Sequence, residues 1–581
     1  MEKNEIIIRL AGEGGEGVIS TGDIFTQGAA RTGYHVFTFR TYPAEIKGGH
    51  AWYQVRVGAY PVLSMGDGVD VMVAFNAEGY YNHKHLINKG GVLIYDPDTV
   101  TPEESSSVIA YGIPFNTIAR KELDFFRGKN LIVTGFLAGL FGLEPSSLEG
   151  LIRSRFARRA ELLASNLKSL YAGYEHATKK IEKRDPYFLT PVEKIPRLVL
   201  SGNDAIAAGA LAAGCRFFAG YPITPASEIL ETMSKELPKL GGVSLQVEDE
   251  IAAIGMAAGA SFGGLKSMTA TSGPGLSLMS EFLGWVSMSE TPCVIVDSQR
   301  AGPSTGMPTK LEQADLNHAL YAGHGDFPRI VMAAGSVEDA FFRIIDAFNL
   351  SEKYQMPAIF LSDQSLSHRT ESMLKPDLSR IHVEDRLRPT AEQLKDYRRY
   401  AVTESGASPM SAPGMAGGAY VAPGLEHDEK GHVDTPLQSH IIMMPKRFRK
   451  LDGARKDMGQ LSRHGAADAT IGVIGWGSTE GVIQEAVDRA NASGHKVAAL
   501  HPKLLSPLQV DDLRKFMDSV EHVIVPEVNY SGQFAHYLRS ILGDSVVQLN
   551  KYGGLPFTPG EIFKKIEEVA RNGNQRGNSH R

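Results

Sequence analysis

The sequence predicts an α/β fold with three domains, each based on a parallel β-sheet. Short apolar runs typical of strands alternate with longer stretches of helical character along most of the 581 residues. This length is enough for roughly three or four domains. Hydrophobic residues make up 43% of the chain and charged residues 22%, an ordinary globular composition. We therefore expect a folded, multidomain protein.

The first predicted domain covers residues 1–185. An apolar run, Ile6–Leu10, precedes a glycine-rich turn and a helix-like stretch through Thr32, and strand-like runs follow at HVFTF, VDVMVAFN and GVLIYD. This alternation is typical of β-α-β units. A charged helical tract, Ser154–Lys183, ends in KKIEKRDP, where we place the first boundary.

The second predicted domain covers residues 195–435 and the third residues 440–581. The second alternates small-residue helices with the strands SLQVED, SMTATSG, PCVIVDS and AIFLSD. Between the two, residues 405–440 are rich in Ser, Pro and Gly, which predicts a long irregular connection. The third is a smaller α/β unit, with strands at TIGVIGWGST, KVAALHP and VEHVIVPEV.

Charge and composition exclude several classes of protein. The formal net charge of −6 gives no reason to expect nucleic acid or an anionic membrane as a partner. The first residues do not have the pattern of a secretory signal, and no apolar stretch approaches the ~20 residues of a membrane span. We expect a cytoplasmic protein. Its two cysteines, Cys215 and Cys293, lie in apolar surroundings, so we expect buried thiols and no four-cysteine iron–sulfur site in this chain.

The glycine-rich turn after the first strand is a candidate phosphate site. Gly12, Gly14 and Gly17 satisfy G-x-G-x-x-G, and backbone amides at a helix start can hold a phosphate. A dinucleotide site also requires an acid at the end of the second strand, but the chain there reads Arg40-Thr41 and reaches Glu45 only later. A plain turn, or another phosphate ligand such as coenzyme A, is favoured over NAD(P).

A Gly66-Asp67-Gly68 sequence invites comparison with the loop that holds Mg²⁺ and diphosphate in thiamine-diphosphate enzymes. Here it runs directly into a strand, and no Asn-Asn pair follows at a suitable distance. We interpret it as a turn before a strand. If this chain serves thiamine, it supplies the other half of the site.

That other half is predicted at SLQVEDEIAAIGMAAGASFGG. Glu250 is expected to begin a helix, with Ala253, Ala257 and Gly259 on the side that faces the sheet. The helix dipole favours a carboxylate there, so a simple helix-start acid remains one explanation. The other is catalytic: the aminopyrimidine ring of thiamine needs a carboxyl group on a ring nitrogen before the cofactor can lose its C2 proton. Glu250 is better placed for this role than the two acids that precede it.

Two further loops carry candidate ligand contacts. In Tyr221-Pro222-Ile223-Thr224-Pro225, two prolines stiffen the backbone around a hydroxyl, which suits either a ligand contact or an ordinary turn. The loop Asp297–Thr309 follows an apolar strand and carries Arg300, four hydroxyls and two glycines. Because ligands bind at strand carboxyl ends and arginine clamps carboxylates, Arg300 is a candidate for a substrate carboxylate; a surface salt bridge is the alternative.

Taken together, YPITPAS, EDEIAAIGMAAGAS, TATSGPG (Thr269–Gly275) and RAGPSTGMPT resemble the α-subunit core of 2-oxoacid:ferredoxin oxidoreductases, in this order and spacing. GEGGEGV with TYPAEIKGGH resembles their γ-type domain. GLEHDEKGH, GWGST and PEVNYSGQF resemble later parts of the same polypeptides, so nearly the whole chain is covered. Two positions depart from the pattern: Glu16 stands where Gln is usual, and Lys47 where Arg is frequent.

The resemblance implies specific roles for these residues. Glu250 would activate the aminopyrimidine ring, and Arg300 with Thr309 would contact the 2-oxoacid. His427 and Asp428 would close over the site. The implied cofactor contacts are Tyr221, Pro222, Ile223, Thr224, Glu250, Thr271 and Ser272; the substrate contacts are Thr224, Arg300, Ser304, Thr309 and Asp428; and the coenzyme A or phosphate contacts are Gly12, Gly14, Gly15, Gly17 and Lys47.

The resemblance also implies an architecture and partners. The three domains would be a γ-type domain, a thiamine-diphosphate domain of the pyrimidine-binding type and a transketolase C-terminal-like domain. A β subunit would hold Mg²⁺, the diphosphate and at least one [4Fe–4S] cluster, in an (αβ)₂ heterotetramer that reduces ferredoxin and acylates coenzyme A.

Of the substrates open to the family, the fused γ–α order and GLEHDE resemble the 2-oxoglutarate group. The reaction would be oxidative decarboxylation to succinyl-CoA, or the reverse carboxylation with strongly reduced ferredoxin. Branched-chain 2-oxoacids, pyruvate and aryl pyruvates remain alternatives. From another class, a non-catalytic nucleotide-binding scaffold built on the Gly12–Gly17 turn also stays open.

Overall fold

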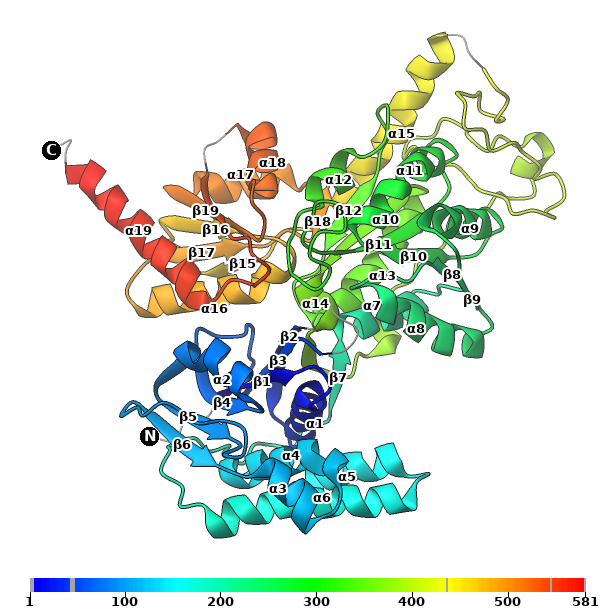
Figure 1. The fold of residues 1–581 in the computed structure, drawn as a ribbon. Coiled ribbons are helices and arrows are strands. Elements are labelled where there is room, and N and C mark those ends of the chain that lie inside the picture. The colour runs from blue at the N-terminus through cyan, green and yellow to red at the C-terminus, as the bar shows by residue number, and fades with distance from the viewer. Residues whose placement is uncertain (1–4, 42–47, 435–436, 544–545, 579–581) are drawn as a thin grey trace. The chain divides into compact units, whose positions relative to one another are not determined.

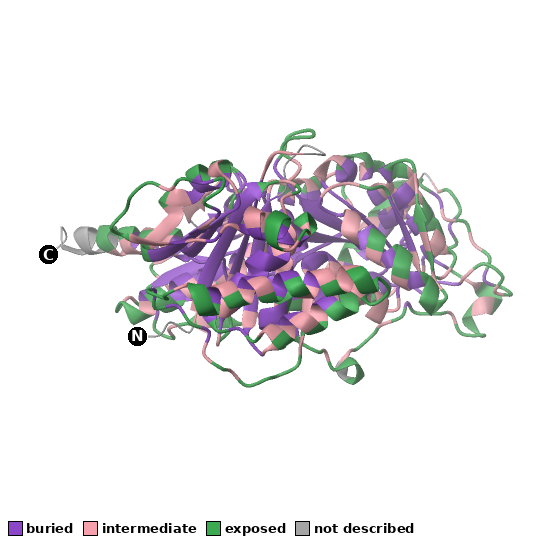
Figure 2. Cartoon of the chain, turned by 60° about the horizontal axis from the view of Figure 1, so that its bottom comes forward, coloured by how far each residue is buried: buried purple, intermediate pink, exposed green. Residues whose placement is uncertain are grey.

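A computed structural model describes residues 5–41, 48–434, 437–543 and 546–578. The chain forms two compact units, shown in Figure 1. Unit 1 consists of Met1–Leu200 and His368–Pro376, and unit 2 of Ser201–Ser367 and Asp377–Arg581. Figure 2 shows that buried residues concentrate on the strands, while most helices are buried along one side only.

Unit 1 contains an eight-stranded sheet in the order β6-β5-β4-β1-β3-β2-β14-β7. Its strands are β1 (Glu5–Glu13), β2 (His35–Thr41), β3 (His50–Gly58), β4 (Val69–Ala74), β5 (Ile87–Tyr95), β6 (Val108–Gly112), β7 (Arg197–Ser201) and β14 (Thr370–Leu374). The predicted β-α-β unit is confirmed: β1, helix α1 (Val18–Arg31) and β2 follow one another. Strand β3, which sequence analysis did not identify, lies antiparallel between β1 and β2.

The helices of unit 1 pack very closely on one another. They are α2 (Ala77–His83), α3 (Phe115–Thr117), α4 (Lys129–Phe141), α5 (Pro145–Phe156) and α6 (Ala160–Lys180). A Cβ atom at Gly135 of α4 would overlap the carbonyl oxygen of Leu170, and one at Gly173 of α6 would overlap that of Ile132. The backbones of α4 and α6 therefore touch where both helices carry glycine.

Unit 2 contains a seven-stranded sheet in the order β18-β12-β13-β11-β10-β8-β9. Its strands are β8 (Phe217–Gly220), β9 (Val243–Gln246), β10 (Ser267–Thr271), β11 (Cys293–Gln299), β12 (Ile330–Ala333), β13 (Pro357–Asp363) and β18 (Leu504–Ser506). All are parallel except β18. Helices α7 (Gly202–Ala212), α8 (Ser227–Glu236) and α13 (Val337–Tyr354) cover one face, and α9 (Glu250–Phe262), α10 (Gly273–Leu278), α11 (Ser280–Met288) and α12 (Leu316–Tyr321) the other (Figure 1).

The carboxyl-terminal part of unit 2 forms a five-stranded sheet in the order β15-β17-β16-β19-β20. Its strands are β15 (Arg463–Gly465), β16 (Ile471–Ile474), β17 (Val497–Leu500), β19 (His522–Glu527) and β20 (Val547–Asn550), with helices α16 (Glu480–Ala492), α17 (Val510–Asp518), α18 (Gln533–Leu542) and α19 (Pro559–Asn578). One hydrophobic core joins both sheets of unit 2 and includes Ile295 and Trp476. The predicted α/β class with three parallel-based sheets is confirmed.

The predicted irregular connection, residues 405–440, is confirmed up to residue 434, but its last four residues, 437–440, are helical. Apart from two short 3₁₀ turns, residues 377–434 have no helix, and α15 (Leu437–Asp457) follows. Buried ionic contacts anchor this segment and the helix after it. Arg386 of the segment forms a bidentate pair with Glu352, and Glu290 binds both Lys446 and Lys450 of α15. Burial would raise the pKa of Glu290, but the two ammonium groups hold it below its ordinary value.

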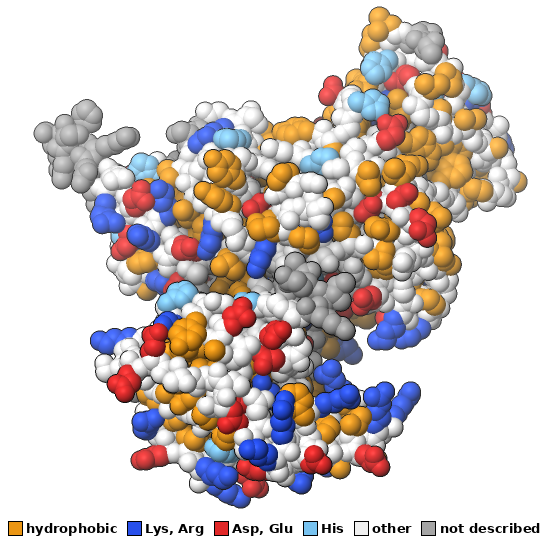
Figure 3. Space-filling view, viewed as in Figure 1, with side chains coloured by type: hydrophobic (Ala, Val, Ile, Leu, Met, Phe, Trp, Pro, Cys, Tyr) orange, Lys and Arg blue, Asp and Glu red, His pale blue; other side chains and the backbone are white. Residues whose placement is uncertain are grey.

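The same segment and the start of α15 have a markedly apolar surface. Val421, Leu425, Val433, Leu437 and Ile441 are all exposed. Figure 3 shows hydrophobic side chains gathered over this part of unit 2, at the upper right. Contiguous exposed apolar surface of this kind is typical of an interaction surface.

The structure confirms two further predictions, one about the cysteines and one about the Gly66–Gly68 sequence. Both cysteines are buried, as expected, and burial raises the pKa of each thiol to about 12. The Gly66–Gly68 sequence is a turn before β4, also as expected. Within the described ranges, no helix combines the length and apolar character that crossing a membrane requires.

We predict that Gly173→Ala lowers the free energy of unfolding of unit 1 by about 1–3 kcal/mol, because the added methyl group forces α4 and α6 apart. Gly150→Ala is the matched control, since a Cβ atom there meets only the Arg31 side chain at 3.6 Å. That change should be neutral or stabilising, as alanine favours a helix. Chemical denaturation of both variants tests this, and equal midpoints would contradict the close contact.

Candidate functional site

The candidate site lies at the carboxyl-terminal edge of four adjacent strands of the seven-stranded sheet. Strand β8 leads into Tyr221–Thr224, β9 into Glu250, β10 into Ser272, and β11 into Arg300. In parallel sheets this edge is where ligands bind. The topology therefore brings the four predicted motifs to one place.

Glu250 begins helix α9, as predicted, and its side chain is buried. Asp249 caps the helix by accepting a hydrogen bond from the Ala252 amide at 2.7 Å. The Glu250 carboxyl group packs directly on Gly275: a Cβ atom there would lie 2.5 Å from Glu250 Oε1 and would overlap the Thr271 hydroxyl. The turn after β10 thus forms a close cradle for the acid.

The prediction for the sheet-facing side of α9 is correct for Ala253 and Ala257 and wrong for Gly259. The two alanines are fully buried in the core, whereas Gly259 is exposed and a Cβ atom there would meet nothing within 4 Å. The helical repeat explains this, because positions four apart share a face and Gly259 is two positions beyond Ala257.

Arg300 follows β11 and is buried, with 7% of its surface exposed. Its Nη1 donates a hydrogen bond to the Thr224 carbonyl oxygen at 2.7 Å, so the two predicted loops touch. Its Nε has no protein partner among the described residues. A surface salt bridge, the alternative considered for Arg300, is therefore wrong. The guanidinium retains an unused donor at the sheet edge.

The remaining predicted contacts divide into two groups. Thr271 and Ser272 are fully buried beside Glu250, and the Ser272 hydroxyl has no hydrogen-bond partner among the described residues. Tyr221 is exposed, and Ser304 lies at the exposed tip of the loop, where Ala301 and Met307 pair. The inner group is placed to hold a ligand, and the outer group faces away from the core.

Asp428 and His427 belong to the long irregular segment. The Asp428 carboxylate accepts hydrogen bonds from the amides of Lys430 and His432 at 2.8 and 2.9 Å, which closes a local turn. His427 is fully buried against the Tyr400 ring, with centroids 4.1 Å apart. In this structure both residues stabilise the segment itself.

Two acids that sequence analysis did not assign also line this edge. Asp297 precedes Arg300 by three residues and pairs in register with Thr271, so it points to the face that carries Glu250. Asp315 packs on Gly273, where a Cβ atom would lie 2.7 Å from Asp315 Oδ2. Asp297 begins the loop Asp297–Thr309 that sequence analysis considered. Only the pairing of β11 with β10 shows which face of the sheet its side chain points to.

The loop between β11 and α12 is held by the carboxyl-terminal sheet. Gln313 is fully buried; its amide donates to the Val528 carbonyl at 2.6 Å and its side chain donates to the Trp476 carbonyl at 2.9 Å. Buried Glu527 accepts hydrogen bonds from Trp476 and Asn529 and from two amides at the start of α18. The motifs GWGST and PEVNYSGQF therefore fix the loop that carries Arg300.

The glycine turn of unit 1 lies between β1 and α1, as predicted, with Gly15 and Gly17 in the left-handed region. The Glu16 carboxylate folds back onto the Glu13 amide at 2.9 Å and onto Asn76 at 2.7 Å. Beside the turn lies a pocket of about 820 Å³. Its basic residues are Arg120, Lys121, Arg127 and Lys129. Lys47 lies outside the described residues.

These basic residues support an anion site, and sequence analysis did not identify them because they come from residues 114–130, far from the glycines. At the end of β2, the Arg40 Nη1 lies 3.6 Å from the Asp23 Oδ1 of α1. Within the described part of the chain, β2 ends in Arg40-Thr41 and carries no acid that could bind a ribose. The pocket therefore fits a phosphate better than a dinucleotide.

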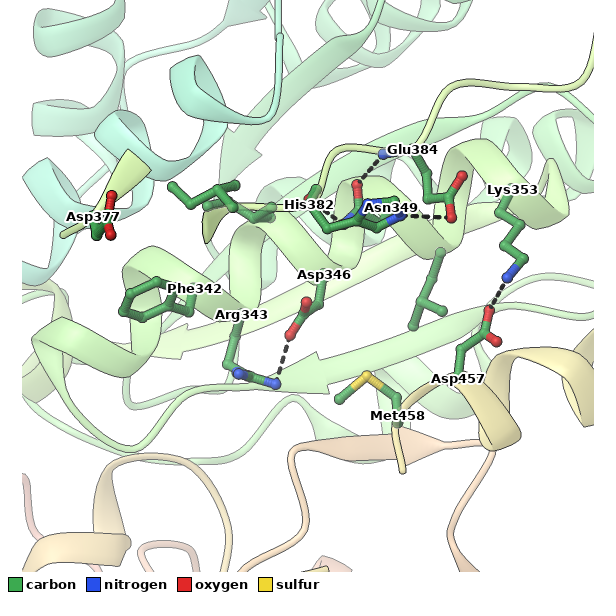
Figure 4. Close-up of a pocket in the computed structure, with 13 residues that line it drawn as sticks. Phe342, Arg343, Asp346, Asn349, Lys353, Asp377, His382, Glu384, Asp457 and Met458 are labelled. Atoms are coloured by element: carbon green, nitrogen blue, oxygen red, sulfur yellow. Dashed lines mark hydrogen bonds and ion pairs between the residues drawn. The ribbon is translucent and has the colours of Figure 1, made fainter. Parts of the chain in front are cut away.

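A second pocket, of about 610 Å³, lies in unit 2 along α13 and is drawn in Figure 4. Its charged side chains neutralise each other: Arg343 binds Asp346 at 2.5 Å and Lys353 binds Asp457 at 2.7 Å. Asn349 is bonded to the backbone of His382 and Glu384. Since these polar groups already have partners, we assign no ligand to this pocket.

Comparison with protein families matches all three parts of the chain. Residues 208–446 match "Pyruvate flavodoxin/ferredoxin oxidoreductase, thiamine diP-bdg". Residues 7–176 match "Pyruvate ferredoxin/flavodoxin oxidoreductase", and residues 469–562 match "Pyruvate:ferredoxin oxidoreductase core domain II". The matches follow the predicted order of domain types over these three stretches.

Individual relatives are similar over their full length. The 2-oxoglutarate oxidoreductase subunit KorA of Mycobacterium tuberculosis is 34% identical, over 97% of this chain and 91% of its own. The 2-oxoacid:ferredoxin oxidoreductase subunit alpha of Saccharolobus solfataricus is 31% identical over 98% of both. A solved structure, 2-oxoglutarate:ferredoxin oxidoreductase from Magnetococcus marinus with 2-oxoglutarate, coenzyme A and succinyl-CoA bound, is 43% identical, with a TM-score of 0.94, over 97% of this chain and 99% of that one.

We predict that Gln313→Ala loosens the loop of residues 300–315 while the rest of unit 2 stays folded. Gln313→Ala removes the side-chain hydrogen bonds to the Trp476 carbonyl and from the Val528 amide. Their loss costs roughly 1–3 kcal/mol locally, so amide hydrogen exchange in the loop should rise more than about tenfold. Gln393→Ala, at an exposed position, is the control. Unchanged exchange in the loop would show that Gln313 does not hold it.

Proposed function

This chain belongs to the 2-oxoacid:ferredoxin oxidoreductase family, as an α subunit, and we propose that its substrate is 2-oxoglutarate. The similarity that carries the proposal is the Magnetococcus marinus enzyme, whose structure holds 2-oxoglutarate, coenzyme A and succinyl-CoA. The Mycobacterium tuberculosis relative is also named for 2-oxoglutarate. The product of oxidative decarboxylation would then be succinyl-CoA.

The residues at the sheet edge fit thiamine diphosphate. The close packing of Gly275 on Glu250 leaves a buried carboxyl group at the start of α9, and Ser272 offers a buried hydroxyl without a protein partner. Thiamine diphosphate, when bound, supplies a nucleophilic carbon and an electron sink for decarboxylation. Glu250 would hold and transfer a proton at a nitrogen of the aminopyrimidine ring.

Arg300 would bind the carboxylate of the 2-oxoacid. Two observations support this role: the Arg300 Nε has no hydrogen-bond partner among the described residues, and its Nη1 is hydrogen-bonded to the Thr224 carbonyl. A guanidinium held by one hydrogen bond can still donate others to an anion. Thr224 and Thr309 would complete the polar contacts. Ser304 and Asp428 remain predictions for the same substrate, and their roles would require the outer loops to close.

A β subunit would supply the ligands for the [4Fe–4S] cluster and for Mg²⁺. Two buried thiols cannot ligate a [4Fe–4S] cluster, and the described residues contain no cluster of acidic, histidine or cysteine side chains suited to a metal. Tyr221, Ile251, Met256, Leu278 and Met307, all exposed, belong to the site or to helices that adjoin it. An apolar rim of this kind favours a site shared with a partner in an (αβ)₂ assembly, with Mg²⁺ and the electron path to ferredoxin on the partner.

Coenzyme A would place its phosphates in the basic pocket of unit 1. Backbone amides of the Gly12–Gly17 turn and the guanidinium groups of Arg120 and Arg127 suit phosphate oxygens. With strongly reduced ferredoxin, the same residues would serve carboxylation of succinyl-CoA, since a catalyst accelerates both directions of a reaction.

We predict that Glu250→Gln abolishes exchange of the C2 proton of bound thiamine diphosphate, by at least about a hundredfold, because an amide cannot share a proton with the ring. The complex with the partner subunit should still assemble. Glu248→Gln, which changes an exposed acid in the same segment, is the control and should exchange normally. NMR measures the exchange of the C2 proton in both variants. Normal exchange in Glu250→Gln would show that another residue activates the aminopyrimidine ring.

We also predict that the assembled enzyme prefers 2-oxoglutarate over 2-oxoisovalerate and pyruvate by more than about tenfold in kcat/KM, because a second carboxylate adds an ionic contact. Viologen reduction with coenzyme A and each 2-oxoacid measures this preference. A faster reaction with 2-oxoisovalerate would make the chain part of a branched-chain enzyme.

A further inference from the structure

The pocket of unit 1 contains two acidic side chains among its basic ones. They are Glu16 and Asp98, which line it with Arg120, Lys121, Arg127 and Lys129. A carboxylate in an anion pocket is unexpected, because it repels the phosphate that the basic groups attract. Asp98 accepts a hydrogen bond from the neutral Thr117 hydroxyl at 2.7 Å, whereas Glu16 pairs with a basic residue of the pocket itself. Glu16 is therefore the acid that changes the charge available to a ligand.

Three donors hold the Glu16 carboxylate in place. Its Oε2 accepts hydrogen bonds from the Glu13 amide at 2.9 Å and from Asn76 Nδ2 at 2.7 Å, and its Oε1 accepts one from Lys129 Nζ at 3.3 Å. Asn76 is fixed in turn, because its Oδ1 caps helix α2 by accepting a hydrogen bond from the Gly79 amide at 2.8 Å. The carboxylate therefore has a defined position in the lining of the pocket.

The first glycine of the turn makes room for this carboxylate. A Cβ atom at Gly12 would lie 2.7 Å from Glu16 Oε2 and 2.8 Å from the Phe75 Cβ atom. In a dinucleotide-binding turn, the glycines allow the tight bend and the close approach of a pyrophosphate. Here a side chain of the same turn fills the space beside Gly12, and the Glu13 amide already has an anionic acceptor. Glu16 thus acts as an internal anion at the turn.

Lys129 is the basic residue that Glu16 neutralises. It begins helix α4, its side chain is 7% exposed, and its Nζ lies 5.2 Å from the centroid of the Phe75 ring. A buried ammonium group is unfavourable without an anionic partner, and Glu16 supplies that partner from within the chain. The positive charge that a ligand meets therefore comes mainly from the exposed side chains of Arg120, Lys121 and Arg127.

We propose that Glu16 is an internal anion that occupies Lys129 and lowers the affinity of the unit 1 pocket for the phosphates of coenzyme A. The inference rests on the proposed binding of coenzyme A in this pocket. Two effects add: Glu16 removes Lys129 as a phosphate ligand, and its own charge repels the phosphate. Weaker binding suits an enzyme whose thioester product carries the same phosphates and must leave after each turnover.

Glu16→Gln separates the charge of this side chain from its shape. The glutamine carbonyl oxygen can accept hydrogen bonds from the Glu13 amide and from Asn76, as Oε2 does in the wild type. The glutamine NH₂ group, which then takes the place of Oε1, cannot accept a hydrogen bond from Lys129. The turn therefore keeps its contacts, while the Lys129 ammonium group becomes available to a ligand.

The test is calorimetric titration of coenzyme A, without a 2-oxoacid, into the chain assembled with its partner subunit. We expect Glu16→Gln to bind coenzyme A about five- to twentyfold more tightly than the wild type at an ionic strength of about 0.01 M. Because the Glu16 side chain is 26% exposed, salt should reduce this gain, to about threefold or less at roughly 0.3 M. Structural damage cannot produce a gain in affinity.

Two further variants locate the effect. Glu78→Gln removes an exposed acid in the first turn of α2, outside the lining of the pocket, and should leave the Kd for coenzyme A unchanged. The double variant Glu16→Gln with Lys129→Met has the same net charge in the lining as the wild type but lacks the ammonium group. It should bind coenzyme A no more tightly than the wild type.

Unchanged or weaker binding in Glu16→Gln, an equal gain in Glu78→Gln, or the full gain in the double variant would each overturn the inference and leave the coenzyme A site in place. The site itself has a separate test in the combined variant Arg120→Ala with Arg127→Ala. If that variant bound coenzyme A as tightly as the wild type, the phosphates would lie outside this pocket, and the proposed site and the inference would both be wrong.

Discussion

The hydrogen bonds of Gln313 are the interaction on which the geometry of the candidate site depends. They tie the loop between β11 and α12 to Trp476 and Val528 of the five-stranded sheet, which buried Glu527 organises in turn. That loop carries Arg300 at its start and Asp315 at its end. A loop of this length has many conformations of its own, so its order must come from outside it. The smaller sheet therefore acts as a support for chemistry on the larger one.

A second constraint is the buried charge of Glu290, which fixes helix α15 directly after the long irregular segment. Lys446 and Lys450, one helical turn apart, bind a single carboxylate inside the core. Burial lowers the pKa of Lys450 to about 7, with Glu290 opposing that shift. Removing one partner of such a cluster leaves a buried charge and costs about 3–5 kcal/mol. The cluster gives α15 one fixed docking position, which hydrophobic contacts alone specify less sharply.

Much of the fold and part of the site could be predicted from sequence, for local reasons. The α/β class follows from alternating strand and helix patterns, and Glu250, Thr224 and Arg300 follow from strand ends in a parallel sheet. Strand β3 was not identified, because its antiparallel insertion between β1 and β2 depends on pairing across the sheet. Asp315 and Gln313 were not identified either, since what distinguishes them is contact with residues far away in the chain.

The glycines show most clearly what the sequence alone does not predict, namely which small residues are packed tightly against another element. Gly259 and Gly275 lie in neighbouring motifs of small residues, yet a methyl group on the first would meet nothing and one on the second would displace Glu250. Spacing could not separate them, because the relevant quantity is the distance from a backbone to a side chain on another element. In unit 1, Gly173 and Gly150 differ in the same way. A small residue in an α/β protein is therefore informative about function only once the element packed against it is known, and at this sheet edge that element carries the acid.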